Sequence, residues 1–203
     1  FIWFLHNSEI YRYDGYRSLN VMPTIPDYDA LNDTPQKILV DKQNRLWIAG
    51  RERLSYLDLK TWKIHHMASP FVPDLKDRTV VRMKQMPDGA VMIAYQNGYL
   101  VIYKEGKVSL VKALYDRSIQ NNNPIIPQSC TFWKGQYRIG TSAGAILSIN
   151  PQQGNTTTYL DLPAIHQSIS YLIALDNRLV IDVPNQGLFA LHENGDLTKE
   201  TIV

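Results

Sequence analysis

The chain has 203 residues, of which 44% are hydrophobic and 20% are charged, and its formal net charge is +2. This composition is that of an ordinary globular chain with a sizeable core. The small, scattered charge argues against nucleic-acid binding. No apolar run approaches the ~18 residues of a membrane helix, so we expect no direct membrane insertion. The single cysteine, Cys130, excludes an internal disulfide and precedes Thr131-Phe132-Trp133 in a predicted inner strand, where we expect an unreactive buried thiol.

Five groups of short apolar or aromatic runs follow one another along the chain, each bounded by turn residues, which is the signal of strands and hairpins. In the first group, the hairpin turn Asp14-Gly15 joins two strands that come after Ile2-Trp3-Phe4. The second group, residues 38–64, reads as four short strands, and the later groups repeat that order. We predict a single domain over residues 1–203, with blades at residues 1–22, 35–66, 79–111, 128–160 and 168–203.

A fixed spacing identifies these groups as repeats. Equivalent second-strand positions recur at intervals of roughly 42 to 46 residues, the period of four-stranded propeller blades, and they are Trp3, Trp47, Met92, Arg138 and Val180. We interpret Trp3 and Trp47 as packing between blades. Arg138 is unexpected at this place and indicates either a shifted register or a side chain that reaches the surface along its stem. The fold class is therefore all-β: a β-propeller of four-stranded antiparallel blades, about five of them in this chain.

The two ends of the chain fall inside the repeat. Ile2-Trp3-Phe4 matches a second strand, and Leu197–Val203 reads as an outer strand. Propellers usually close by completing one blade from both termini, because open strand edges favour aggregation. We therefore expect the chain to be part of a larger propeller.

No metal or cofactor site is predicted. The loop containing Asp27, Asp29 and Asp33 lacks the glycine turn and the terminal glutamate of a calcium loop, and we interpret it as a solvated surface loop. His65 and His66 are adjacent on a predicted strand and point to opposite faces, so they are poorly placed to share one zinc ion.

The second blade resembles a known repeat. Residues 38–56 combine an inner strand, an aspartate with a polar turn, Leu46-Trp47-Ile48-Ala49-Gly50, and a Leu-x-Tyr strand. This arrangement is similar to the two-component regulator propeller repeat, roughly Asp-x-x-Gly-x-Leu-Trp-Ile-Gly-Thr followed by Gly-Leu and Tyr-Asp. The resemblance extends over essentially the whole chain, through residues 2–15, Gly140-Thr141 and Gly187-Leu188, although later blades lose the tryptophan. Asn44 stands where the repeat usually has glycine, a change that the same turn accepts.

What the resemblance implies is the periplasmic sensor portion of a hybrid two-component histidine kinase, the extracytoplasmic part of an inner-membrane protein. Such propellers typically recognise oligosaccharides and control genes for carbohydrate use, together with the remaining propeller and sandwich domains of the receptor. The chain has no phosphate-binding glycine loop and no convincing phospho-acceptor histidine segment. We therefore expect a binding module and not an enzyme.

In a propeller, the turns from second to third strand and the links between blades share one face, and binding residues usually lie on such loops. The polar residues of these turns predict a ligand site at one mouth of the propeller. The predicted ligand-binding residues are Asn7, Arg51, Arg53, Gln96, Asn97, Asn185 and Gln186, with His6, Glu52 and Ser142 beside them.

Two alternatives remain open. The propeller could be an interaction scaffold that binds another protein or forms a homodimer. It could also be a glycosidase or lyase, which would need two carboxylates at a defined separation around the mouth. Glu52 is the one acid among the mouth turns, with Asp182 near a strand end, which is weak support for catalysis.

Overall fold

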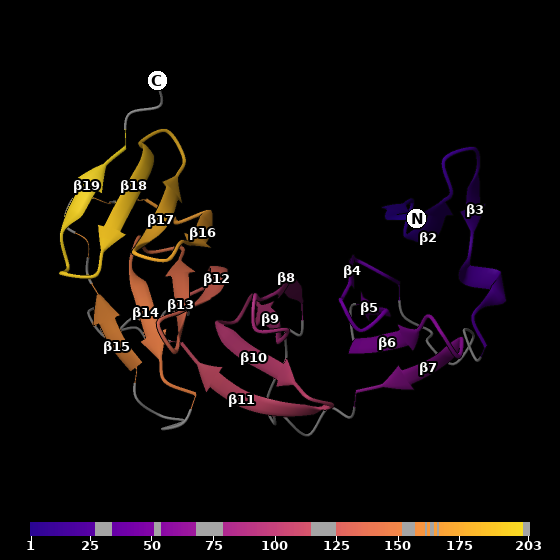
Figure 1. Cartoon of the computed structure of the whole chain (residues 1–203). Coiled ribbons are helices and arrows are strands. Elements are labelled where there is room, and N and C mark those ends of the chain that lie inside the picture. Colours follow the sequence, from indigo (N-terminus) through magenta and orange to yellow (C-terminus); the bar gives the residue numbers. More distant parts are fainter. Residues whose placement is uncertain are drawn as a thin grey trace.

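The computed structural model describes residues 1–26, 34–50, 54–67, 79–114, 125–151, 157–160, 162, 165 and 167–200. These residues form five antiparallel sheets that follow one another around an open arc (Figure 1). The first sheet has three strands, β1 (Ile2–His6), β2 (Glu9–Tyr13) and β3 (Ser18–Asn20), followed by a 3-10 turn, η1 (Met22–Thr24). The second sheet has four, β4 (Lys37–Val40), β5 (Arg45–Ala49), β6 (Leu54–Asp58) and β7 (Lys63–His66).

The other three sheets have the same four-stranded order. The third comprises β8 (Val80–Gln85), β9 (Val91–Tyr95), β10 (Tyr99–Lys104) and β11 (Lys107–Ala113). The fourth comprises β12 (Pro127–Trp133), β13 (Gln136–Thr141), β14 (Ile146–Ile149) and β15 (Thr157–Leu160). The fifth comprises β16 (Tyr171–Ala174), β17 (Arg178–Val183), β18 (Gly187–His192) and β19 (Leu197–Lys199).

This arrangement is a β-propeller, as the repeat predicts. The first strands of the four-stranded sheets, β4, β8, β12 and β16, contact one another in succession along the concave side of the arc (Figure 1). Each sheet continues outward by antiparallel pairing with the next strand of the sequence. Within the described residues, no helix is long and apolar enough to cross a membrane.

The hydrophobic core lies between successive sheets. Trp47 shows how it is built: its side chain is 0% exposed and its ring lies 4.9 Å from that of Tyr103 in the third sheet. The indole Nε1–H donates to Asp41 Oδ2 at 2.8 Å. Met92, the equivalent residue of the third sheet, is likewise buried and belongs to the same apolar cluster as Ile139 of the fourth. Packing between blades is thus confirmed for Trp47, and each sheet covers its neighbour's apolar face.

Arg138 occupies the same position between the fourth and fifth sheets, so the predicted register is right and no shift is needed. Its guanidinium carbon lies 5.5 Å from the ring centroid of Trp133, and Nη1 donates to Ser148 Oγ. Nε is buried without a hydrogen-bond partner among the described residues. Burial lowers the pKa of this guanidinium. A charged side chain therefore fills a gap that an apolar residue fills elsewhere.

Turn chemistry positions the strands of the second sheet. Asn44 has φ +60°, the left-handed conformation that glycine or asparagine tolerates, which explains how it replaces the glycine of the repeat. Asp41 is buried beside it, and its carboxylate accepts from the backbone N–H groups of Gln43 and Arg45 at 2.9 and 3.0 Å. This turn closes the β4–β5 hairpin.

Cys130 and the histidine pair have structural surroundings. Cys130 is 0% exposed, its Sγ lies 3.3 Å from Met86 Sδ, and burial raises the pKa of the thiol to about 12. The expected burial of the thiol is confirmed, and the raised pKa disfavours the thiolate, which is the reactive form. His65 stacks on Tyr56 while His66 Nδ1 lies 3.0 Å from Ser55 Oγ, so the two rings have separate partners.

Candidate functional site

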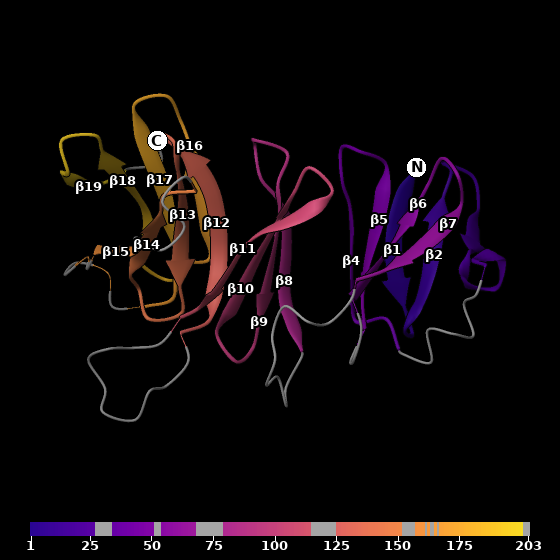
Figure 2. The ribbon, with the colours of Figure 1, turned by 90° about the horizontal axis from the view of Figure 1, so that it is seen from below.

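The turns predicted to form the mouth lie at one edge of the arc. Because successive strands run antiparallel, the β1–β2, β9–β10, β13–β14 and β17–β18 turns all fall at the same ends of their sheets. Figure 2 shows the strands from the side, running between this edge and the opposite one. These turns carry Asn7, Gln96, Asn97, Ser142, Asn185 and Gln186. Arg51, Glu52 and Arg53 lie outside the described residues, and so do Asp27, Asp29 and Asp33.

Several of these side chains or backbones serve the turns themselves. Asn7 and Asn185 have φ +49° and +62°, so both hold left-handed turn positions. Asn97 Oδ1 accepts the N–H of Tyr99 at 3.4 Å, and Ser142 Oγ accepts that of Ile126 at 3.2 Å. These four residues therefore have a structural role whatever they bind.

Gln96 and Gln186 are different. The side chain of Gln96 is exposed, and its backbone N–H donates to Thr79 O at 3.0 Å. The side-chain oxygen of Gln186 is buried and has no hydrogen-bond partner among the described residues. Both residues keep side-chain hydrogen-bonding capacity at the predicted mouth, and this capacity is what a neutral polar ligand would need.

A hollow of about 330 Å³ opens near this edge, close to the concave side of the arc. It is lined by Leu5, Lys37, Ile38, Val81, Arg82 and Met83. Lys37 and Arg82 come from the beginnings of the inner strands β4 and β8, and Leu5 precedes the β1–β2 turn. None of these described lining residues is acidic. Lys37 and Arg82 were not predicted from the sequence as site residues, because both lie on inner strands and not on the mouth turns.

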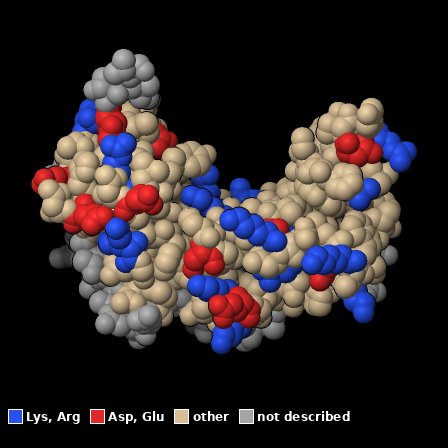
Figure 3. Space-filling view, viewed as in Figure 1, with Lys and Arg blue, Asp and Glu red and all other residues tan. Residues whose placement is uncertain are grey.

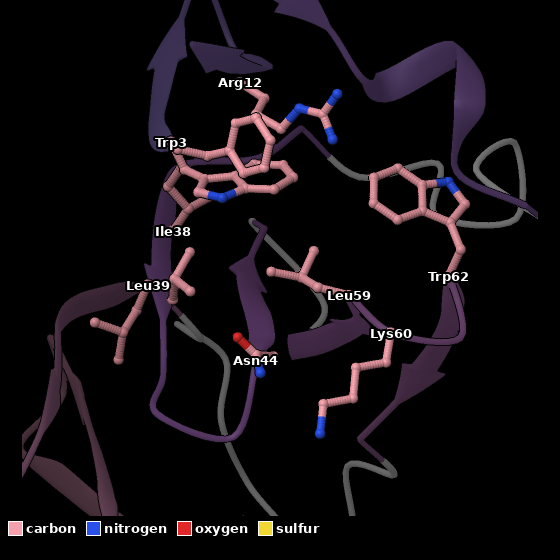
Figure 4. Close-up of a pocket in the computed structure, with 10 residues that line it drawn as sticks. Trp3, Arg12, Ile38, Leu39, Asn44, Leu59, Lys60 and Trp62 are labelled. Atoms are coloured by element: carbon pink, nitrogen blue, oxygen red, sulfur yellow. The ribbon is translucent and has the colours of Figure 1, made fainter. Parts of the chain in front are cut away.

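A larger hollow, of about 600 Å³, lies at the opposite edge, between the first two sheets (Figure 4). This volume falls within the ~300–1,000 Å³ typical of small-molecule sites. The described residues of its lining are aromatic, aliphatic, basic or neutral polar, and none of them is acidic: Phe1, Trp3, Arg12, Ile38, Leu39, Val40, Asn44, Leu59, Lys60 and Trp62. Trp3 is half-buried here, in contrast to Trp47, and it packs against the apolar cluster between the first two sheets, as predicted, while part of its side chain lines the hollow.

Each wall of the larger hollow comes from a different strand or turn. Trp3 and Arg12 are cross-strand partners in the β1–β2 pair, and the guanidinium carbon of Arg12 lies 4.5 Å from the ring centroid of Phe1. Trp62 stands across the hollow, in the β6–β7 turn (Figure 4). Its Nε1–H donates to Thr24 O at 2.7 Å, which ties the second sheet to the segment after the first. Figure 4 shows Leu59 between these two sides and Lys60 along the lower rim.

The charges of the described surface are unevenly distributed. On the face shown in Figure 3, acidic side chains gather over the C-terminal sheet, whereas basic ones extend over the middle of the arc. No group of three or more metal-ligating side chains occurs among the described residues. Among the described residues that line the two hollows, none is a carboxylate.

Comparison with known proteins finds similar structures but no matching sequence family. No family model and no curated protein matches the sequence. Among solved structures, the chain is similar to the extracellular domain of a hybrid two-component system from B. thetaiotaomicron, at 19% identity with a TM-score of 0.65, over 99% of this chain and 26% of that one. It is also similar to Saccharomyces cerevisiae Sqt1 (12% identity, TM-score 0.70, 94% and 54% of the two chains).

A third match is a virginiamycin B lyase from Staphylococcus aureus, at 11% identity with a TM-score of 0.60, over 96% of this chain and 63% of that one. The chain thus spans about a quarter of the matched sensor domain and about half of Sqt1. At these identities the matches establish the propeller fold alone. A sensor and a lyase share this fold, so the fold alone does not determine the function.

Proposed function

We propose that this chain is an extracytoplasmic ligand-sensing propeller of a two-component signalling receptor, and that it recognises oligosaccharides to control carbohydrate use. The observation that carries the proposal is the coincidence of two independent likenesses. Residues 38–56 resemble the two-component regulator propeller repeat, and 99% of the chain superposes on part of an extracellular domain from such a system. The proposed location, the periplasmic side of an inner membrane, follows from the same likenesses.

The surface of the propeller is compatible with a sugar ligand. Sugars present many hydroxyl groups, which suit neutral polar side chains such as those of Gln96 and Gln186. Their ring faces suit aromatic surfaces, and Trp3 and Trp62 offer two of these. The described linings of both hollows hold no carboxylate, which favours binding over glycoside hydrolysis.

A thermal-shift titration against a panel of plant and host oligosaccharides tests the proposal. A ligand at a hundred times its dissociation constant stabilises the protein by roughly 2.7 kcal/mol, which raises the melting temperature of a domain of this size by several degrees. We expect a dose-dependent rise with one class of glycan. A flat panel, repeated by calorimetry to detect binding without a thermal shift, would contradict the proposal.

Alanine substitutions locate the predicted mouth. We expect Arg51→Ala and Gln96→Ala to weaken binding of the responding glycan without lowering the melting temperature, because Gln96 is exposed and supports no core contact. Lys107→Ala is a matched control, since Lys107 is exposed in the β10–β11 turn at the other edge. Unchanged affinity in both mouth variants would place the site elsewhere.

A protein-interaction scaffold is the second candidate, and exposed apolar side chains at the two ends of the arc favour it. In the first sheet Ile2 is 63% exposed, and in the fifth Tyr171 and Ile173 are 54% and 55% exposed. Exposed apolar surface commonly marks an interface. Light scattering of the wild type and of Ile173→Ser distinguishes the candidates: a dimer that the substitution dissociates, together with a flat glycan panel, would favour the scaffold.

A further inference from the structure

We propose that the hollow between the first two sheets binds an acidic oligosaccharide, whose sugar rings stack on Trp3 and Trp62 and whose carboxylate or sulfate groups pair with Arg12. The inference rests on the proposed function for the glycan nature of the ligand. It adds a charge class and a site at the edge opposite the predicted mouth.

The backbone at Trp62 is the first observation behind this proposal. Trp62 has φ +58°, a left-handed conformation that is unusual for a bulky residue. Glycine or asparagine would fit this turn with less strain, and strained side chains of this kind cluster at functional sites. The hydrogen bond from Nε1 to Thr24 O then fixes the indole in one orientation. The strain therefore places a rigid aromatic face at the hollow.

The walls of the hollow suit the apolar faces of sugar rings. Trp3 forms one wall and Trp62 another, with Ile38 and Leu59 between them (Figure 4). An aromatic ring has an electron-rich face, which attracts the weakly positive C–H groups of a sugar. Two such rings on opposite sides of one hollow can hold successive sugars of a chain, or both faces of a single sugar.

The charge of the lining indicates an acidic ligand. Arg12 and Lys60 are the charged side chains among the described residues of the lining, and no described acidic side chain forms an ion pair with either. Asp58 lies near Lys60, but its Oδ1 accepts the backbone N–H groups of Lys60 and Thr61 at 2.8 and 3.0 Å. Those hydrogen bonds lower the pKa of Asp58 and keep its carboxylate at the turn. Arg12 is therefore available for a planar anion, which its guanidinium can bind through two parallel hydrogen bonds.

Three probes test the charge class by tryptophan fluorescence: tetragalacturonate for carboxylates, a chondroitin sulfate tetrasaccharide for sulfates, and maltotetraose as the neutral control. We expect a saturable change with at least one acidic probe and none with maltotetraose at the same concentrations. Binding should weaken between low and high salt, because exposed charges are screened. The acidic probe that binds identifies which anionic group the hollow takes.

Substitutions then locate the site. Arg12→Gln should raise the dissociation constant of the acidic probe at least about tenfold, a factor that corresponds to 1.4 kcal/mol. Trp62→Asn should weaken binding of the acidic probe, measured by calorimetry because the substitution also removes a fluorophore, while asparagine keeps the left-handed turn and the melting temperature reports folding separately. Arg17→Gln is the matched control, because Arg17 lies in the β2–β3 turn of the same sheet, where its side chain is 81% exposed and pairs with Asp14. This control should bind like the wild type.

Each other outcome overturns the proposal in a distinguishable way. Acidic probes that bind equally to Arg12→Gln and the wild type would show that the hollow is not their site. Loss of binding in Gln96→Ala instead would move the site to the mouth and leave the sensor function standing. Binding of maltotetraose alone would refute the charge class and leave that function standing as well. Failure of every glycan would contradict both proposals.

Discussion

Asp41→Ala should be among the most destabilising substitutions in the second sheet, because one buried carboxylate satisfies four donors there. The side chain of Asp41 is 0% exposed, and its Oδ2 accepts from Arg45 Nε at 2.6 Å and from Trp47 Nε1 at 2.8 Å. Its Oδ1 accepts the two backbone N–H groups that close the β4–β5 turn. Alanine leaves a wholly buried indole N–H and a nearly buried guanidinium without this partner. Breaking a buried ion pair costs about 3–5 kcal/mol.

Urea unfolding followed by tryptophan fluorescence measures this loss. For a domain of this size, about 3–5 kcal/mol corresponds to a fall in melting temperature of roughly 6–20 °C. Asp14→Ala is the matched control: Asp14 accepts two backbone N–H groups in a similar turn, at 2.9 Å each, but in an exposed position. We expect a much smaller effect there. Equal losses in the two variants would refute the argument that burial makes the Asp41 hydrogen bonds costly to remove.

Three further substitutions test the core between the sheets. A methyl group at Gly140 would lie 2.5 Å from Ile169 Cγ2 and 2.6 Å from Ser129 Oγ, so Gly140→Ala should cost about 1–3 kcal/mol of unfolding free energy in urea. Its control, Gly135→Asn, lies in open space at φ +75° and should be nearly neutral. Arg138→Met should be at least as stable as the wild type, since it removes a desolvated charge and keeps an unbranched apolar side chain in the gap. A clear loss of stability would show that the hydrogen bond to Ser148 outweighs the cost of desolvation. Burial raises the pKa of Cys130 to about 12 in the folded protein, whereas an unfolded thiol loses its proton near pH 8.5. The wild type should therefore lose stability relative to Cys130→Ala as the pH rises from about 9 to 11, by up to roughly 1.4 kcal/mol per pH unit. Parallel pH profiles of the two proteins would contradict the raised pKa.

The fold could be predicted because its information is local and repeated. The spacing that relates Trp47 to Met92 reflects one structural requirement, a second-strand residue that faces the next blade, and both residues are buried there. Arg138 meets the same requirement with a different side chain, so the spacing located it correctly although its chemistry looked inconsistent. The spacing of the repeat thus predicts where a side chain points, even when the polarity of that side chain varies.

The hollows could not be predicted in the same way, because their residues come from different blades and from both edges of the arc. Trp62 bonds to Thr24, which lies 38 residues earlier. Arg12 reaches the larger hollow because it pairs with Trp3 across two strands. Neither of these two contacts recurs at the fixed spacing of the repeat. The left-handed backbone at Trp62 was equally hidden, because the residue that normally signals such a conformation is glycine or asparagine. The predicted mouth residues remain a prediction, since nothing in the described geometry tests what they bind.

The inner strands favour an anionic ligand whichever edge of the propeller binds it. The described inner strands β4, β8, β12 and β16 carry Lys37, Arg82 and Lys84 and no acidic residue. Lys84 is partly buried, its Nζ lies 3.4 Å from Leu172 O of the fifth sheet, and desolvation lowers its pKa. Arg82 and Lys37 line the smaller hollow near the mouth. Basic side chains in a concave, low-dielectric surface raise the local concentration of anions and speed their association.

Because these basic side chains attract anions over a distance, association and dissociation rates can show which of the two hollows binds an acidic glycan. For an acidic glycan held at the larger hollow, Lys37→Gln together with Arg82→Gln should slow association, while dissociation stays at the wild-type rate, because rim charges act mainly on the encounter. Arg12→Gln should instead speed dissociation, since it removes a contact within the bound complex. Surface plasmon resonance at two salt concentrations measures both rates. If the inner-strand variant speeds dissociation while Arg12→Gln leaves it unchanged, the bound glycan lies near the mouth, and the basic inner strands are part of its site.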